Sequence, residues 1–192
     1  HVNVATSLLA QVDAAVGCKT GLNTPAGKNL VGAFHHPRAV LLDTGALASL
    51  CPEEMRNGLA EVVKHAALAD AELFAELEQW AEQRKSWTPP QSVIGRCVQI
   101  KADVVAEDEH DHGRRQLLNF GHTVGHAIEQ ATQHTVAHGA AVACGMVVEA
   151  RLAAQAGWAA PSLAPRLEAL LSQLQLPTQP PCSFELAAKA LA

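Results

Sequence analysis

The chain of 192 residues is poor in aromatic side chains, which make up 4% of it and include no tyrosine. Alanine, leucine and valine must therefore fill most of its interior. Basic residues are also scarce, since 14 lysines and arginines stand against 19 aspartates and glutamates, for a net charge of -5. Because nucleic-acid-binding surfaces carry clustered positive charge, this balance argues against a nucleic-acid partner.

Long apolar runs, a basic leader and paired cysteines are missing as well. No stretch approaches the ~20 apolar residues that cross a bilayer, and the first residues lack the plan of a signal peptide. The 5 cysteines are widely spaced and never arranged as CxxC, which argues against a disulfide framework and against a thiolate metal site. We therefore expect a cytoplasmic protein with reduced thiols and no membrane partner.

The apolar pattern predicts a short α/β entry followed by a helical domain. The entry has an extended start at 1–4, a helix at 8–16, a loop rich in turn formers at 17–32 and one strand at 39–43. The pattern beyond it predicts helices at 53–68, 70–84, 90–107, 114–132, 138–156, 162–174 and 183–191. We therefore divide the chain into a domain of residues 1–45 and a domain of residues 46–192.

One face of the helix expected at 114–132 carries a stripe of four polar side chains at successive helical contacts. They are Arg115, Asn119, His122 and His126. Gly121 and Gly125 lie between them, and each costs ~1 kcal/mol relative to alanine inside a helix. The glycines therefore predict close approach of another backbone or of a ligand, and the stripe predicts a site.

A second polar stripe, in residues 57–65, includes Glu61. Glu61 with two histidines would form a three-ligand set that leaves coordination positions open, as catalytic zinc sites do. His122 and His126 have the i,i+4 spacing that can bind one ion, but helix packing could equally bring in His138. The spacing leaves both choices open.

Cationic side chains suited to phosphate and carboxylate groups are spread over the loop and the helices. They are Lys19, Lys28, Lys64, Lys101, Arg114 and Arg115. Lys101 has apolar neighbours in the sequence, which predicts a buried or half-buried position.

Six segments resemble the 3-dehydroquinate synthases of the sugar-phosphate cyclase superfamily, in the same order and at the same spacing. They are residues 8–13, 19–21, 27–34, 58–64, 117–129 and 138–143. The resemblance implies a mainly α fold, in which a helical metal-binding C-terminal domain follows a remnant (helix, loop and short strand) of the α/β NAD-binding domain.

The resemblance also implies a reaction, the conversion of 3-deoxy-D-arabino-heptulosonate 7-phosphate to 3-dehydroquinate and phosphate in the shikimate pathway. Bound NAD⁺ oxidises a secondary alcohol, phosphate leaves, the ketone is reduced back, and an intramolecular aldol addition closes the ring. The implied cofactors are NAD and one divalent metal, zinc or cobalt. The implied partners are a small phosphorylated sugar acid and a second copy of the chain, in a homodimer.

Carried over residue by residue, the resemblance gives each polar side chain a role. The metal ligands are Glu61, His122 and His138. The catalytic groups are His126, which transfers protons, with Asp111 and Lys101. The substrate contacts are Asp13, Lys19, Asn29, Lys64, Lys101, Arg115 and Asn119, and the cofactor contacts are Thr6, Ser7, Lys19 and Lys28.

The chain departs from the family pattern at Cys18, where glycine is usual, and at Asp111, where glutamate is usual. A positive φ at Cys18 would cost strain, and the shorter Asp111 would weaken a proton relay. The family's glycine-rich nucleotide-binding unit should precede residue 1, and its lysine-rich segment should follow residue 192. We therefore expect this chain alone to bind NAD poorly and to turn over slowly or not at all.

Three other functions compete with this interpretation. Another sugar-phosphate cyclase is the nearest, although Asn29, Lys101, Arg115, Asn119 and His126 have the identities of the 3-dehydroquinate synthases. A polyol dehydrogenase would not require so many phosphate-directed cations. A non-catalytic metal-binding fragment would keep the metal without turnover.

Overall fold

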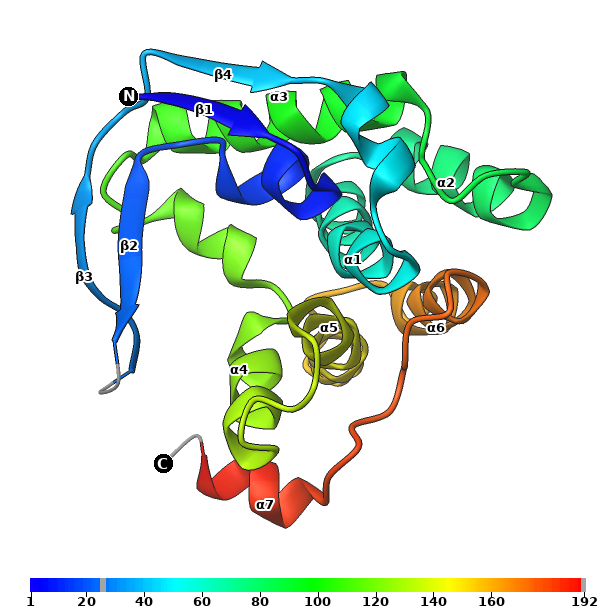
Figure 1. Ribbon diagram of the computed structural model, residues 1–192. Helices are drawn as coiled ribbons and strands as arrows, with labels where there is room; N and C mark the ends of the chain where they lie inside the picture. The colour runs from blue at the N-terminus through cyan, green and yellow to red at the C-terminus, as the bar shows by residue number, and fades with distance from the viewer. Residues whose placement is uncertain (25–26, 191–192) are drawn as a thin grey trace.

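The computed structural model describes residues 1–24 and 27–190, and it is mainly helical (Figure 1). Its α-helices are α1 (Pro52–Ala69), α2 (Ala71–Gln83), α3 (Gln91–Glu107), α4 (His122–Ala131), α5 (His138–Gln155), α6 (Leu163–Gln173) and α7 (Phe184–Lys189). A π-helix η1 (Ala10–Ala14) and two 3-10 helices, η2 (Thr44–Ser49) and η3 (Arg114–Asn119), complete them. The mainly α fold is confirmed, and the helices match the expected ones closely everywhere except at 114–132.

The strands form two separate pairs. β1 (Val2–Ala5) runs parallel to β4 (Ala39–Leu42), so the strand expected at 39–43 has the extended start of the chain as its partner. β2 (Lys19–Thr24) and β3 (Gly27–Phe34) form an antiparallel hairpin, which projects from the helices in Figure 1. The loop expected at 17–32 is therefore wrong, because cross-strand hydrogen bonds order a segment whose composition favours turns.

The single helix expected at 114–132 is also wrong. η3 ends at Asn119, and Gly121, with a φ of 79°, precedes the start of α4. Glu149 of α5 accepts hydrogen bonds from the backbone N–H groups of Gly121, at 2.7 Å, and Val124, at 3.2 Å. A carboxylate that binds the free N–H groups of a helix start stabilises the break, so the polar stripe lies on two helices.

The main core lies among α1, α2, α3, α5 and α6, and aliphatic side chains fill it as expected. Leu59, Val63, Met146, Leu167 and Leu171 are all fully buried there. Phe74 is the only aromatic side chain among the buried core members of the described part of the chain. None of the described helices is both long enough and apolar enough to cross a membrane.

α4 and α5 cross through glycines, which confirms the predicted close approach of a second backbone. A Cβ on Gly145 would lie 2.0 Å from the Gly121 carbonyl oxygen, and one on Gly125 would lie 3.2 Å from Val142 Cα. Glycine at these positions lets the start of α4, with His122, lie directly against α5.

Asp70 joins α1, α2 and α3, and it carries a prediction on acid stability. Its Oδ1 caps α2 by accepting from Leu73 N at 2.9 Å, and its Oδ2 pairs with Arg96 at 2.6 Å. Burial raises the pKa of Asp70, but the Leu73 and Arg96 hydrogen bonds outweigh it and leave that pKa below its usual value. The stabilisation is therefore present above the unfolded pKa of about 3.9 and is lost as pH falls through the lower folded pKa.

Replacing Asp70 with alanine should lower the free energy of unfolding by about 1–2 kcal/mol at pH 7, through loss of the cap. The deficit relative to the original chain should shrink below about pH 4, the range of the carboxyl pKa. Urea denaturation at several pH values measures both quantities. The matched variant Asp70→Asn keeps a capping oxygen and should lose the smaller share of stability, and a deficit in Asp70→Ala that is the same at every pH would contradict the assignment.

Candidate metal and substrate site

Three side chains from three helices converge at the centre of the fold. Glu61 lies in α1, His122 is the first residue of α4, and His138 is the first residue of α5. The Nε2 atoms of His122 and His138 both lie 3.5 Å from Oε1 of Glu61. The structure therefore places His138, and not His126, beside Glu61 and His122 as the third member of a potential ligand set.

The second nitrogen of each imidazole ring is held by the protein. His122 Nδ1 lies 3.3 Å from the Phe120 carbonyl oxygen, and His138 Nδ1 lies 3.2 Å from Oε1 of Glu129. Metal-binding histidines are commonly oriented in this way, because a hydrogen bond from one ring nitrogen leaves the other free for the ion. Both rings are thus oriented with Nε2 toward the Glu61 carboxylate.

The Glu61 carboxylate fits a divalent cation. It is fully buried, and among the described residues neither of its oxygens accepts a hydrogen bond of good geometry. Lys64 Nζ forms an ion pair with Oε2 at 2.5 Å. Burial raises the pKa of Glu61, but Lys64, His138 and His122 together hold it well below its usual value. A buried carboxylate with two imidazoles is a donor set that zinc and cobalt accept.

The two histidines differ in protonation before any metal binds. Burial lowers the pKa of His122 to about 4, with a further contribution from Lys64. Burial also opposes the charge of His138, but the neighbouring carboxylates of Glu129 and Glu61 raise its pKa to about 9. His122 is therefore neutral at pH 7, whereas a metal must displace a proton from His138.

His126 lies beside this set, one helical turn along α4 from His122. Its ring is exposed, 5.4 Å from the His122 ring and nearly perpendicular to it, and 6.3 Å from the His138 ring. It approaches Glu129 and His138 closely enough to form a second possible group. The geometry places His126 next to the Glu61 set but outside it.

A cavity of about 130 Å³ adjoins His122 and gathers the residues predicted from the sequence to contact substrate. It is lined by Asp13, Lys19, Lys64, Lys101, Asp111, Arg115, Leu118, Asn119 and His122. A larger cavity of about 690 Å³ between η1 and the hairpin shares Asp13, Lys19, Lys101 and Arg115 with it. Every predicted substrate contact whose side chain the structure describes lines the small cavity.

The cations of this cavity are held by neighbouring oxygens. Lys101 is nearly buried, as expected, and donates to Oδ1 of Asp13 at 2.6 Å. Burial lowers the pKa of Lys101. Burial raises the pKa of Asp13, but the positive charge of Lys101 outweighs this effect, and the pKa of Asp13 is lowered. Lys19 pairs with Asp111, and buried Arg115 donates to the Glu109 carbonyl at 2.6 Å. Each of these cations therefore already has an oxygen partner before any ligand arrives.

The predicted cofactor contacts are only partly assembled. Thr6 is exposed, and Ser7 Oγ accepts from the backbone of Ala10 at 3.2 Å; neither residue lines the two cavities. The backbones of Lys28 and Asn29 lie in β3, but their side chains lie outside the described part of the chain. Lys19 alone therefore connects the described cofactor contacts to the cavities.

The two departures from the family pattern have different outcomes. Cys18 does not have a positive φ, because the neighbouring Gly17 takes the left-handed conformation with a φ of 108°. Asp111 does have a positive φ, of 62°, which aspartate tolerates better than most residues. Its Oδ1 is buried without a hydrogen bond in the described structure, and its Oδ2 meets Lys19.

Sequence reasoning missed the roles of several supporting groups, although it placed Asn57 in the polar stripe with Glu61. Glu129 holds His138, Glu149 holds the start of α4, and Asn57 Oδ1 accepts from Gly139 N at 2.5 Å at the start of α5. Glu129 lies seven residues after His122, on the same side of one helix. That spacing would have pointed to Glu129. Glu149 could have been found as the single acidic residue in the apolar helix α5.

Two family models together match the whole chain. The model described as 3-dehydroquinate synthase N-terminal matches residues 1–57, and the one described as 3-dehydroquinate synthase C-terminal matches residues 58–192. The 3-dehydroquinate synthase of Halorhodospira halophila is 48% identical over 184 residues, which cover 94% of this chain and 52% of that protein. The one of Acaryochloris marina is 46% identical over 194 residues, with 98% and 52% covered. The chain thus spans about half the length of these relatives.

Solved structures share the fold, among them two with NAD⁺ bound. One is ValA, a 2-epi-5-epi-valiolone synthase from Streptomyces hygroscopicus with NAD⁺ and Zn²⁺ bound. It is 34% identical with a TM-score of 0.89, and the match covers 100% of this chain and 54% of the ValA chain. The other is 2-deoxy-scyllo-inosose synthase complexed with carbaglucose-6-phosphate, NAD⁺ and Co²⁺, with a TM-score of 0.83 at 25% identity, over 99% of this chain and 53% of that one.

Proposed function

Because the chain belongs to the 3-dehydroquinate synthase family, we propose that it carries the metal-binding and substrate-binding half of a 3-dehydroquinate synthase. The enzyme would convert 3-deoxy-D-arabino-heptulosonate 7-phosphate to 3-dehydroquinate and phosphate. One observation carries the proposal: the predicted substrate contacts whose side chains are described line one cavity that also contains His122 of the Glu61 set.

Glu61, His122 and His138 would hold the divalent metal, zinc or cobalt. When bound, the metal would polarise the oxygens of the substrate, and NAD would reversibly oxidise one of its secondary alcohols. NAD enters this proposal because both solved structures have NAD⁺ bound. Among the described cofactor contacts of this chain, Lys19 is the one that lines the cavities.

The buried cations would bind and orient the anionic substrate. Lys64 is 2% exposed and Arg115 4%, so water screens their charges little and their attraction for phosphate or carboxylate is strong. Lys19 is more exposed than these two residues and pairs with Asp111. Because it is exposed, it can exchange Asp111 for a substrate oxygen. Holding the substrate in one orientation is itself a large part of the catalysis expected here.

His126 would transfer a proton, with Asp111 and Lys101 as further catalytic groups. Its ring is exposed, so it can exchange protons with water, and it lies next to ligand His122. Imidazole is the side chain whose ordinary pKa suits general acid and base catalysis near neutral pH. A homodimer and a cytoplasmic location remain predictions.

Phosphate release tests the proposal. We expect little or no phosphate from the heptulosonate 7-phosphate when the 192-residue chain is supplied with NAD⁺ and Zn²⁺. Release should appear when the portion of the Halorhodospira halophila relative that this chain does not match is added as a second polypeptide. Lys101→Met, which removes a cavity cation, should abolish that release while Lys85→Met, outside both cavities, should not.

Two outcomes would replace the proposal by one of its alternatives. Metal binding without phosphate release in the reconstituted mixture would identify a non-catalytic fragment. Release from glucose 6-phosphate but not from the heptulosonate would identify another sugar-phosphate cyclase. Glucose 6-phosphate is the test compound because the solved inosose synthase is complexed with carbaglucose-6-phosphate.

A further inference from the structure

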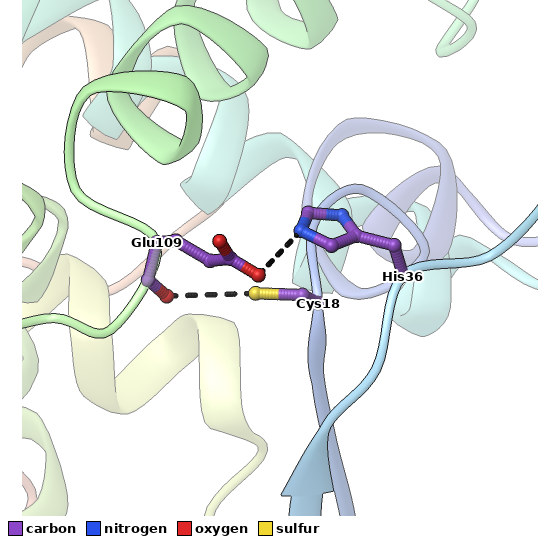
Figure 2. Close-up of side chains that lie close together, drawn as sticks. All are labelled: Cys18, His36 and Glu109. Carbon is purple, nitrogen blue, oxygen red and sulfur yellow. Dashed lines mark hydrogen bonds and ion pairs between the residues drawn. The ribbon is translucent and has the colours of Figure 1, made fainter.

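We propose a second metal site, formed by Cys18, His36 and Glu109 and separate from the Glu61 set. Figure 2 shows the three side chains turned toward one another from three segments of the chain. His36 Nε2 lies 2.8 Å from Oε1 of Glu109, and one ligand atom from each of the three residues lies within 4.8 Å of the others. The group would bind a zinc-like divalent cation.

The three residues come from both ends of the hairpin and from the turn that faces it. Cys18 precedes β2, His36 follows β3, and Glu109 follows α3. The hairpin ends are joined by a hydrogen bond from His35 N to the Cys18 carbonyl at 2.7 Å. The backbone therefore holds Cys18 and His36 next to each other at the end of the hairpin. Cys18 Sγ lies 3.5 Å from the Glu109 carbonyl oxygen, which brings the turn after α3 to the same place.

The donor types and their exposure suit such an ion. Thiolate, imidazole and carboxylate are the zinc donors, and their bonds of about 2.0–2.3 Å place the donor atoms about 3.5 Å apart in a tetrahedron. Cys18 is fully buried, whereas the side chains of His36 and Glu109 are 55% and 46% exposed. The two exposed side chains can rotate apart to admit the ion, and water would supply a fourth ligand.

Binding would change one covalent bond. The S–H bond of Cys18 breaks, its proton passes to solvent, and the thiolate sulfur forms a bond to the metal. The Glu109 carbonyl keeps its hydrogen bond from Arg115 at 2.6 Å, and Arg115 Nη1 also lies 3.4 Å from Cys18 Sγ, where a metal-bound thiolate can still accept from it. The site therefore adjoins the substrate cavity through Arg115 without using its other groups.

The metal would fasten the hairpin to the turn after α3. That turn includes Asp111, which pairs with Lys19 of the hairpin, so both contacts cross the same gap. Without metal, the gap is bridged by the Lys19–Asp111 pair, the exposed His36–Glu109 pair and the Cys18–Glu109 hydrogen bond. Exposed ion pairs contribute little to stability. An ion bonded to both sides would hold Lys19 and Arg115 in place at the cavity.

Cobalt spectroscopy distinguishes this site from the first one, because only a thiolate ligand gives an intense sulfur-to-cobalt absorption in the near ultraviolet. Co²⁺ titrated into the 192-residue chain should produce that band, and it should persist in His122→Ala, which removes a ligand of the sulfur-free Glu61 set. Cys18→Ser should abolish the band, and Cys51→Ser, at an exposed cysteine outside the cluster, should leave it intact.

His36→Gln and Glu109→Gln should each raise the Co²⁺ concentration at half-maximal absorption by at least about tenfold. Loss of a group that only supports a ligand already lowers metal affinity by about that factor, and loss of a ligand should lower it at least as much. Both side chains are exposed, so these variants test the site without threatening the fold. Absence of the band in the unmodified chain, its survival in Cys18→Ser, or indifference to both exposed substitutions would overturn the proposal.

Discussion

Gly145→Ala should destabilise the chain by about 3 kcal/mol or more, although alanine favours a helix by about 1 kcal/mol over glycine. The added Cβ would lie 2.0 Å from the Gly121 carbonyl oxygen and 3.0 Å from Gly125 N. Both atoms are backbone, so no side-chain rotation can relieve the overlap. α4 must move away from α5, and His122 at its start must move with it. Urea denaturation would measure the loss.

Gly95→Ala is the matched control for this effect. Gly95 lies within α3, and a Cβ there would meet nothing within 4 Å. The same substitution should therefore stabilise the chain by about 0.5–1 kcal/mol, through helix propensity alone. Equal effects at both positions would mean that α4 and α5 do not cross through their glycines.

Glu61→Gln should remove metal binding at the Glu61 set and also destabilise the metal-free chain by about 3–5 kcal/mol, the usual cost of breaking a buried ion pair. Glutamine is close to glutamate in size, so the loss comes from charge and not from packing. Lys64, 2% exposed, would be left without its carboxylate. Thermal denaturation in the presence of a chelator would measure the stability, and zinc titration would measure the binding.

The double variant Glu61→Gln/Lys64→Met separates these two effects. Removing both charges should restore most of the stability, since the large cost comes from leaving one buried charge without its partner. It should not restore zinc binding, because the carboxylate ligand is still missing. Zinc affinity that returned together with stability would show that Glu61→Gln acts by unfolding the site and not by removing a ligand.

The long helices and part of the site were predictable because they depend on local pattern. Apolar residues at helical spacing placed α1, α2, α3, α5 and α6, and a polar stripe on α1 drew attention to Glu61. Spacing could not choose between His126 and His138, since the choice depends on how α5 packs against α1 and α4. The family resemblance selected His138, and the structure places that residue beside Glu61.

The errors have a common physical origin in contacts between distant residues. Strands β2 and β3 are ordered by cross-strand pairing, which turn-forming residues do not reveal. The break before α4 depends on Gly121 and on Glu149 from another helix. The proposed site would likewise depend on distant residues, since Cys18 and Glu109 are 91 residues apart and CxxC spacing does not bear on such a pair.

Zinc titration of three proteins tests the ligand assignment most directly. The reference is Cys18→Ser, which removes the proposed second site, and His138→Ala and His126→Ala are then made in that background. Zinc affinity should fall by more than about 100-fold in the His138→Ala protein, beyond the loss from removing a supporting group, and should stay near the reference in the His126→Ala protein. Loss of zinc from the His126→Ala protein with none from the His138→Ala protein would contradict a metal held by Glu61, His122 and His138.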